Sequence, residues 1–400
     1  MARIIPIALA GSERTGERLE FRSQPPLSLY IHIPWCVEKC PYCDFNSHQA
    51  RERIPEDDYI AALIADLESA LPLVWGRRIA TVFIGGGTPS LLSGAAIDTL
   101  LTAVRTRIPL LPDAEVTLEA NPGTVEAGRF AAYRDAGVNR LSLGIQSFNP
   151  RHLQALGRIH DGREARQAIE LAVRHFDRFN LDLMYGLPGQ TLAEAQEDVD
   201  TALGFAPKHL SCYQLTLEPN TRFAAEPPQL PEADLCADMQ DAIEARLAET
   251  GYRHYETSAF AQAGHECQHN LNYWLFGDYL GIGAGAHGKL TMHDRVLRQM
   301  RWKQPAQYLK QATAGTPVHE AFDVGAADLP FEFMMNALRL NDGFDPALFE
   351  ARTTVPLLAI ERILRRVEAD GLIERSAQRI APTKRGQRFL NSLLQQFLAP

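Results

Sequence analysis

The sequence has little cysteine, no excess of basic residues and no long apolar run. Its 400 residues include 40 Lys and Arg against 49 Asp and Glu, a formal net charge of -9, so the charge balance gives no case for nucleic acid as a partner. Six cysteines spread over the chain do not make the dense framework of a disulfide-stapled secreted protein. A reducing compartment, the cytoplasm, fits this composition better.

Membrane-spanning and secretory segments are not indicated either. No stretch reaches the roughly twenty apolar residues that a bilayer span needs. The first residues, MARIIPIALAGSERTGER, hold an apolar run of seven residues at most, which is too short for a secretory signal peptide. We therefore expect a cytoplasmic protein, with peripheral contact at the inner membrane left open. The length and the hydrophobic content of 46% predict two or three folded domains.

Three of the six cysteines lie within eight residues, where Cys36, Cys40 and Cys43 form a C-x3-C-x2-C array. This spacing also suits the apolar face of a helix, but Pro41 would break that helix, so we interpret the segment as a loop after a strand. Zinc would need a fourth ligand, for which His32 or His48 is available. An iron–sulfur cluster held by three thiolates keeps one iron open. The spacing favours a cluster and leaves zinc as the alternative.

Apolar segments alternate with helical patterns from residue 27 to residue 223. Strands are predicted at 27–33, 79–84, 115–122, 140–147, 179–185 and 209–217, and helices at 57–75, 95–107, 125–136 and 192–204. Such alternation predicts a parallel sheet with right-handed crossovers. A complete eight-unit barrel uses about 250 residues, so we predict an α/β fold built on a partial (β/α)6 barrel.

Polar residues recur at or just beyond the carboxyl ends of these predicted strands. They are the three cysteines, the glycine-rich segment 85–88, Glu119, Gln146 and Asp182. Each alone could be a helix cap, a surface amide or a salt-bridge partner, but ligands of parallel α/β folds bind at this end of the sheet. The segment GGGTPS lacks the lysine of a P-loop and the pattern G-x-G-x-x-G. It offers backbone amides and carbonyls that could hold a small zwitterion.

The cysteine array, GGGTPS, LEANPGT, GIQSF and DLMYGLPGQT, in this order, resemble the radical S-adenosylmethionine (radical SAM) superfamily and its coproporphyrinogen-dehydrogenase-like branch. The resemblance covers roughly residues 28–390. It implies that Cys36, Cys40 and Cys43 hold a [4Fe–4S] cluster whose open iron chelates S-adenosylmethionine. It further implies cofactor contacts from Tyr30, Tyr42, Gly86, Gly87, Thr88, Glu119, Gln146, Arg158 and Asp182. An electron from the cluster would then cleave the sulfonium bond and release a 5′-deoxyadenosyl radical.

Two functions occur in this branch, and two features of the sequence separate them. The coproporphyrinogen III dehydrogenase carries a further cysteine, C-x3-C-x2-C-x-C, where this sequence has Phe45. HNLNYW at 269–274 resembles the H-N-x-x-Y-W motif of the heme chaperones. The resemblance therefore favours a protein that binds heme and delivers it to acceptor hemoproteins, without oxidase activity. Oxidative decarboxylation of coproporphyrinogen III is the alternative, and a homodimer is left open.

Heme iron is commonly held by imidazole or thiolate. The candidates are His265, Cys267, His269 and His287, although a lone histidine is more often structural, and we choose His269. A glycine-dense loop is predicted at 277–288, and it has few side chains that would prevent a flat porphyrin from lying against it.

The final segment predicts a helix, a hairpin and a helix, in a winged-helix-like arrangement. Between residues 361 and 388 there are eight basic and four acidic residues. This excess of positive charge is modest for phosphate binding, so we prefer a structural cap to a DNA-binding unit. A zinc-dependent transcription factor is the third hypothesis. The expected domains are a leader at 1–26, a radical SAM core at 27–223, a segment with HNLNYW at 224–327 and a mainly helical domain at 328–400.

Overall fold

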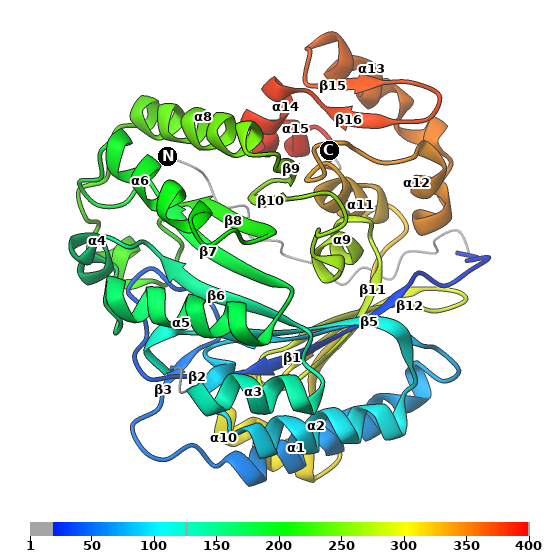
Figure 1. The fold of residues 1–400 in the computed structure, drawn as a ribbon. Helices are drawn as coiled ribbons and strands as arrows, with labels where there is room; N and C mark the ends of the chain where they lie inside the picture. The colour runs from blue at the N-terminus through cyan, green and yellow to red at the C-terminus, as the bar shows by residue number, and fades with distance from the viewer. Residues whose placement is uncertain (1–18, 125–126, 399–400) are drawn as a thin grey trace.

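A twelve-stranded sheet organises the protein in the computed structural model, which describes residues 19–124 and 127–398 (Figure 1). From one edge to the other its strands are β14 (Val318–Asp323), β13 (Val296–Arg301), β12 (His287–Thr291), β11 (Asp278–Ile282), β1 (Leu27–Ile33), β4 (Ile79–Gly86), β5 (Leu110–Ala120), β6 (Arg140–Gln146), β7 (Phe179–Tyr185), β8 (His209–Gln214), β10 (Ala259–Ala261) and β9 (Arg253–Glu256). Of the predicted leader at 1–26, residues 1–18 lie outside the described residues.

Six of these strands, β1 and β4 to β8, are parallel neighbours in chain order. They are connected by α1 (Glu56–Ala70), α2 (Gly94–Arg107), α3 (Ala127–Ala136), α4 (Pro150–Ala155), α5 (Gly162–His175) and α6 (Leu192–Leu203). Figure 1 shows α1, α2 and α3 on one side of the sheet, together with α10 (Pro305–Thr313). The predicted (β/α)6 core is therefore confirmed, although the first two residues of its third helix, 125 and 126, are not among the described ones.

Two of the parallel strands, β1 and β7, are almost entirely buried although both carry polar residues, because both faces of the sheet are covered. In β1 every residue except Tyr30 is buried, and in β7 every residue except Asp182 is buried. These two partly exposed side chains are both among the predicted site residues. In these two strands the partly exposed positions are the ones that line the cavities described below.

The region predicted as a glycine-dense loop is mostly strand, which corrects that expectation. Asp278–Ile282 forms β11, which pairs in parallel with β1, and β12 to β14 continue the sheet beyond it in antiparallel order. A Cβ at Gly281 would clash with the carbonyl oxygen of His287, so glycine is needed for the close approach of β11 and β12. The glycines allow close strand pairing here, although their density is also typical of turns.

The C-terminal unit contains α11 (Leu329–Ala337), α12 (Pro346–Thr353), η4 (Leu357–Ile360), α13 (Glu361–Ala369), β15 (Ile373–Arg375), β16 (Ile380–Pro382), α14 (Lys384–Arg388) and α15 (Leu390–Gln395). The predicted order of helix, hairpin and helix is confirmed, because β15 and β16 pair in antiparallel fashion between α13 and α14. Its core is built around Phe333, Phe344 and Phe349, and Phe21 and Phe276 pack into it. The unit is thereby packed against the segments that lead into β1 and β11.

The connecting elements between the barrel and the C-terminal unit are short, apart from one helix. They are α7 (Arg222–Ala225), α8 (Ala233–Glu249) and α9 (Gln268–Trp274). Short elements within the barrel itself are β2 (Trp35–Cys36), β3 (His48–Gln49), η1 (Leu71–Leu73), η2 (Pro89–Leu91) and η3 (Pro122–Thr124). Within the described ranges, no helix has both the length and the apolar character needed to cross a membrane.

Candidate functional site

The three clustered cysteines line one cavity at the carboxyl end of the parallel strands. Cys36 ends β2, Cys40 and Cys43 lie in the loop that follows, and all three thiols are half-buried. The amide of Cys43 donates to the carbonyl of Cys40 over 3.2 Å, so the loop turns back on itself as the interpretation of Pro41 predicted. Burial raises the pKa of the Cys36 and Cys43 thiols. We call this space the cysteine cavity.

The described residues contain no group of three or more His, Cys, Asp or Glu side chains arranged to hold a single metal ion. The two histidines considered as a fourth zinc ligand have other partners. The ring nitrogens of His32 lie 2.9 Å from the hydroxyl of Tyr30 and 3.0 Å from the carbonyl of Asn46. Nε2 of His48 lies 3.3 Å from Oδ1 of Asn46. Neither histidine lines the cysteine cavity.

The predicted rim residues converge on the cysteine cavity, as expected from the alignment of parallel strands. Eight of the nine proposed cofactor contacts line it: Tyr42, Gly86, Gly87, Thr88, Glu119, Gln146, Arg158 and Asp182. Tyr30 does not, because its side chain lies in a neighbouring cavity. Tyr213, at the end of β8, also lines the cysteine cavity and was missed by the sequence analysis. The rule that placed the other rim residues could have found it.

The glycine-rich segment brings two loops close together. A Cβ at Gly87 would lie 2.6 Å from the carbonyl oxygen of Trp35, so a side chain there would push the cysteine loop away. The amides of Gly87 and Thr88 already donate to the carbonyls of Ile33 and Trp35, each over 2.7 Å. These two amides are therefore used within the fold, and the expectation that the segment offers free amide donors to a ligand is wrong at these two positions.

Two carboxyl groups, those of Glu119 and Asp182, lie in the wall of the cysteine cavity and are only partly exposed. Burial raises the pKa of Glu119 to about 8, although its carboxylate accepts a 2.9 Å hydrogen bond from the amide of Gly86. Burial also raises the pKa of Asp182, against hydrogen bonds from Asn180 and Ser142. Acids with raised pKa values gain from a nearby cation, so both groups suit an ammonium or a ribose hydroxyl.

Arg158 and Gln146 show features typical of a ligand site. Nη1 of Arg158 lies 3.6 Å from the thiol of Cys40, and Nη2 donates to the carbonyl of Gly144 over 2.8 Å. Its Nε is buried and has no partner among the described residues. Gln146 has a φ of 68°, an unusual backbone conformation for a residue other than glycine, and accepts a 2.7 Å hydrogen bond from Tyr213. These groups could hold a carboxylate and hydroxyls.

A second cavity lies between the loop that carries Cys40 and Cys43, which we call the cysteine loop, and the strands that continue the sheet beyond β1. We call these strands, β11 to β14, the sheet extension. It is lined by Tyr30, His32, Asp44, Phe45, Asn46, Tyr273, Tyr279, Gly285, His287 and Lys303. Phe45 lines both cavities and is 58% exposed, an unusual position for a large apolar side chain. Tyr279 and Lys303 were not singled out from the sequence, since neither lies in a recognisable motif.

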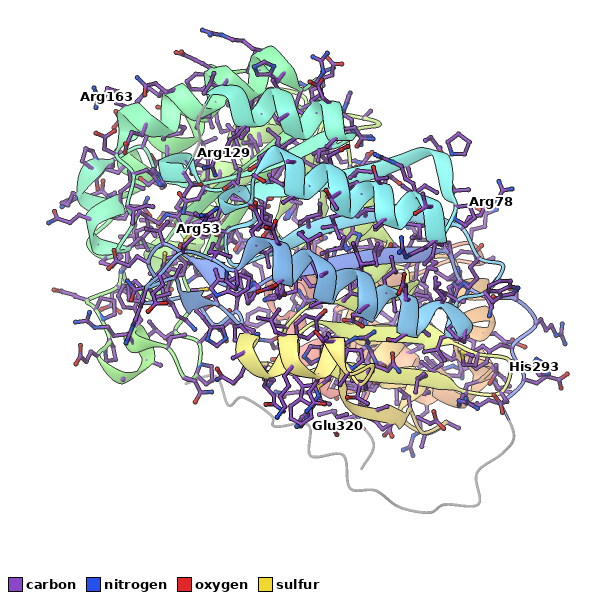
Figure 2. All side chains as sticks on the ribbon, turned by 90° about the horizontal axis from the view of Figure 1, so that it is seen from below. Arg53, Arg78, Arg129, Arg163, His293 and Glu320 are labelled. Atoms are coloured by element: carbon purple, nitrogen blue, oxygen red, sulfur yellow. The ribbon has the colours of Figure 1, made fainter. Side chains whose placement is uncertain are left out.

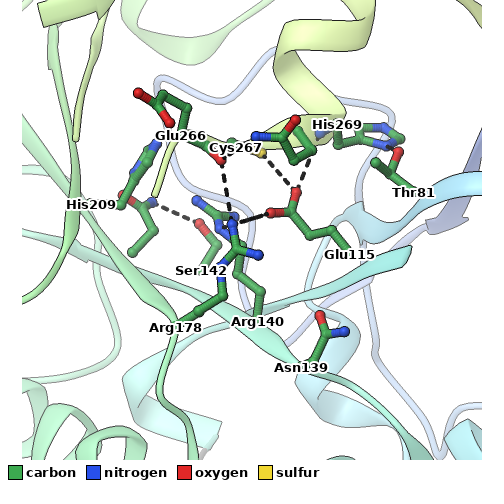
Figure 3. Close-up of polar contacts among 12 residues, drawn as sticks. Thr81, Glu115, Asn139, Arg140, Ser142, Arg178, His209, Glu266, Cys267 and His269 are labelled. Atoms are coloured by element: carbon green, nitrogen blue, oxygen red, sulfur yellow. Dashed lines mark hydrogen bonds and ion pairs between the residues drawn. The ribbon is translucent and has the colours of Figure 1, made fainter. Parts of the chain in front are cut away.

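The HNLNYW motif forms most of α9, and Figure 3 shows its His269 beside Thr81 of β4 and Glu115 of β5. His269 is 2% exposed, and its Nδ1 lies 2.7 Å from the hydroxyl of Thr81. Its backbone amide and the thiol of Cys267 both point to Oε1 of Glu115, at 3.3 and 3.5 Å. Burial, with the positive charge of Arg140 nearby, lowers the pKa of His269 to about 3. This position argues against His269 as a ligand of heme in the folded chain.

The other predicted heme ligands differ widely in accessibility. Cys267 is 1% exposed and directly precedes α9. His265 is half-buried and lines neither cavity. His287 is exposed and lines the second cavity. From the motif itself, only Tyr273 reaches that cavity.

Comparison with known proteins gives a consistent set of relatives. Residues 30–202 match the radical SAM superfamily and residues 325–389 match the HemN C-terminal domain. The chain is 52% identical over 377 residues to the heme chaperone HemW of Escherichia coli, covering 94% of this chain and 99% of that protein. It is 49% identical over 380 residues to the heme chaperone HemW of Haemophilus influenzae, covering 94% and 98%. Among solved structures, the coproporphyrinogen III oxidase HemN of Escherichia coli, a radical SAM enzyme, superposes with a TM-score of 0.80 at 26% identity, covering 94% and 90%.

Proposed function

Because the chain belongs to the heme chaperone HemW family within the radical SAM superfamily, we propose that it binds heme and delivers it to acceptor hemoproteins. The observation that carries this proposal is the 52% identity to a heme chaperone over 94% of the chain. The fold alone does not distinguish a chaperone from an oxidase, since the solved structure of HemN superposes over the same extent. Phe45, at the position of a further cysteine in the dehydrogenase pattern, supports the chaperone.

The cofactors of the superfamily are a [4Fe–4S] cluster and S-adenosylmethionine, and the cysteine cavity fits both. We propose that Cys36, Cys40 and Cys43 hold the cluster. Three thiolates leave one iron open, as chelation of the cofactor's amino and carboxylate groups requires. When bound, the cluster supplies one-electron chemistry to the sulfonium of S-adenosylmethionine.

The residues of this chain would position the cofactor in the same cavity. Arg158, whose buried Nε has no partner in the described part of the chain, would bind the carboxylate. Glu119 and Asp182 would bind the ammonium or the ribose hydroxyls, and Gly86, Gly87 and Thr88 would contact the methionine portion. Tyr42 and Gln146 complete the wall. Tyr30 would act from the second cavity, through the hydrogen bond that it shares with His32.

The proposal includes a cytoplasmic location, where the protein would reach acceptor hemoproteins in solution or at the membrane surface. It also includes a division of the chain into four parts: a leader, a radical SAM core, a linking segment with HNLNYW and a C-terminal domain. Light scattering of the full chain, with and without heme, would distinguish a monomer from a homodimer. Nucleic acid has no part in the proposal.

The test of the proposed function uses the full chain with its cluster reconstituted under anaerobic conditions. Heme uptake is measured by absorbance titration, and delivery by the appearance of holo-protein from an apo-hemoprotein mixed with the heme-loaded chain. Coproporphyrinogen III and S-adenosylmethionine are supplied in a parallel assay. We expect uptake and delivery without porphyrin product. Turnover of coproporphyrinogen, or a chain that takes up no heme, would overturn the proposal.

A further inference from the structure

Asp182 in the wall of the cysteine cavity is held by one buried side-chain amide. Nδ2 of Asn180 donates to Oδ1 of Asp182 over 2.7 Å and to the hydroxyl of Ser142 over 2.8 Å. The hydroxyl of Ser142 in turn donates to Oδ2 of Asp182 over 3.2 Å. Asn180 is 2% exposed, so these hydrogen bonds are made within the protein. Both oxygens of Asp182 therefore accept a hydrogen bond that depends on the orientation of the Asn180 amide.

The oxygen of the same amide accepts two further hydrogen bonds. Nδ1 of His209 lies 2.7 Å from Oδ1 of Asn180, and the hydroxyl of Ser211 donates to this oxygen over 3.1 Å. An amide oxygen has no proton to donate, so Nδ1 of His209 carries the proton of this contact. A rotated amide would turn its NH2 group against these two donors and its oxygen against Asp182. His209 and Ser211, both on β8, thus fix the amide nitrogen toward Asp182.

A tyrosine on the other side of the imidazole completes this arrangement. Burial, with the charges of Arg140 and Arg178, lowers the pKa of His209 well below its usual range, so the ring is neutral. A neutral imidazole has one donor and one acceptor nitrogen, and with Nδ1 as the donor, Nε2 is the acceptor. The hydroxyl of Tyr255 lies 2.8 Å from Nε2 and accepts a 3.2 Å hydrogen bond from the amide of Cys267. Tyr255 therefore gives its proton to Nε2 and selects this tautomer of His209.

Every donor in this chain of contacts points toward the cysteine cavity. The order is Tyr255, His209, Asn180 and Asp182, and the first three side chains are 2%, 3% and 2% exposed. Hydrogen bonds donated to a carboxylate favour its ionised form, so the chain opposes the burial that raises the pKa of Asp182. The positive charge of Arg140 acts in the same direction.

From these contacts we infer that His209 is a positioning residue of the cofactor site, because it holds Asn180 in the orientation that keeps Asp182 an ionised acceptor. The inference rests on the proposed binding of S-adenosylmethionine in the cysteine cavity, where Asp182 would bind the ammonium or the ribose hydroxyls. His209 itself lines neither cavity. It would act on the cofactor only through Asn180 and Asp182.

The experiment measures equilibrium binding of S-adenosylmethionine to the full chain, with its cluster reconstituted, in variants of His209. His209→Asn places an amide nitrogen near the position of Nδ1 and is expected to keep the affinity within about threefold of the wild type. His209→Gln reaches toward Tyr255 instead of Asn180, and His209→Leu has no donor, so both are expected to lose about tenfold in affinity. A role in packing alone predicts the opposite order, since Leu suits a buried site better than an amide does.

A double-mutant cycle tests whether the effect passes through Asp182. Asp182→Asn alone should weaken cofactor binding at least about tenfold, and adding His209→Leu to it should cause less than about twofold further loss. The matched control is His152→Leu, because His152 of α4 is 0% exposed and lines neither cavity. It is expected to bind the cofactor as the wild type does.

Urea unfolding of each variant identifies the folded preparations among which affinities are compared. Equal affinities for His209→Asn and His209→Gln, or additive losses in the cycle, would overturn the inference while the proposed cofactor site stands. If the wild type binds no S-adenosylmethionine, or if Asp182→Asn binds it as well as the wild type does, the proposed role of Asp182 fails and the inference fails with it.

Discussion

Nδ1 of His269 lies 2.7 Å from the hydroxyl oxygen of Thr81, which in turn donates to the hydroxyl of Ser28 over 2.7 Å. Because the Thr81 proton is used toward Ser28, His269 donates its Nδ1 proton to Thr81, which leaves Nε2 as a buried acceptor without a partner among residues 19–124 and 127–398. The histidine of the HNLNYW motif thus fastens α9 to the strands β1 and β4. In the folded chain His269 therefore makes a structural contact between the motif and the sheet.

We therefore expect His269→Ala to lower the free energy of unfolding by about 2–4 kcal/mol, from a lost hydrogen bond and a new cavity. The heme affinity of the folded fraction should stay at the wild-type value. Urea unfolding and hemin titration of the same preparation check both points. A variant of normal stability that no longer takes up heme would contradict this role.

Replacement of any one of Cys36, Cys40 and Cys43 by serine should abolish the iron and sulfide content of the anaerobically reconstituted protein, because a three-thiolate site cannot spare a ligand. Cys236→Ala is the matched control, since this buried thiol lies on α8 and lines neither cavity. Metal analysis that finds zinc in the wild type, or iron retained in all three serine variants, would reject the cluster site.

Arg158→Met should weaken the binding of S-adenosylmethionine at least about tenfold, because a charged hydrogen bond is worth about 1.5–3 kcal/mol. The control is Arg163→Met, which removes an exposed arginine of α5 at the outside of the molecule (Figure 2). Equilibrium binding of the cofactor to reconstituted protein gives the comparison. Equal affinities for the two variants would remove Arg158 from the site.

A fully buried ion pair joins α1 to the sheet extension: Oδ1 of Asp66 lies 3.0 Å from Nη2 of Arg301, and both side chains are 0% exposed. Asp66→Asn leaves the arginine charge buried and should lower the free energy of unfolding by about 3–5 kcal/mol. The exposed pair of Asp200 and Arg246 provides the control, and Asp200→Asn should cost less than about 1 kcal/mol. Similar losses for both variants would contradict this assignment.

Glu256 should make stability depend on pH, because burial raises its pKa from 4.5 to about 7. Between these values the folded chain binds a proton that the unfolded chain has released, so the free energy of unfolding falls as the pH rises from about 4.5 to 7. At about 1.4 kcal/mol for each pKa unit, this carboxyl contributes on the order of 3 kcal/mol to that fall.

In Glu256→Gln the contribution should disappear, and the variant should gain stability relative to the wild type as the pH is raised across this window. Urea unfolding at the two ends of the window measures the difference between variant and wild type. A difference that stays constant with pH would show that Glu256 has an ordinary pKa.

Much of the barrel and its rim could be predicted because the relevant signals are local. Strands such as β1 and β7 are mainly apolar, which marks a sheet covered on both faces. The carboxyl ends of parallel strands meet at one edge, so Glu119 on β5 and Asp182 on β7 could be assigned to one site without knowledge of their contacts.

The second cavity could not be predicted in this way, because it depends on a strand pairing between distant segments. β11 pairs with the free edge of β1, which brings His287 and Lys303 beside the cysteine loop. Its glycine-rich sequence predicted a loop, since glycine is typical of turns as well as of closely packed strands.

The sequence by itself determined the cluster motif, the parallel βα core and the family, because each follows from residue spacing along short stretches of chain. Only the tertiary structure decided which histidine is accessible. His269 lies in the most recognisable motif but is directed into the barrel by its bond to Thr81, whereas His287 faces a cavity. Accessibility depends on what packs against a side chain from elsewhere in the fold, and spacing along the chain carries no record of those contacts.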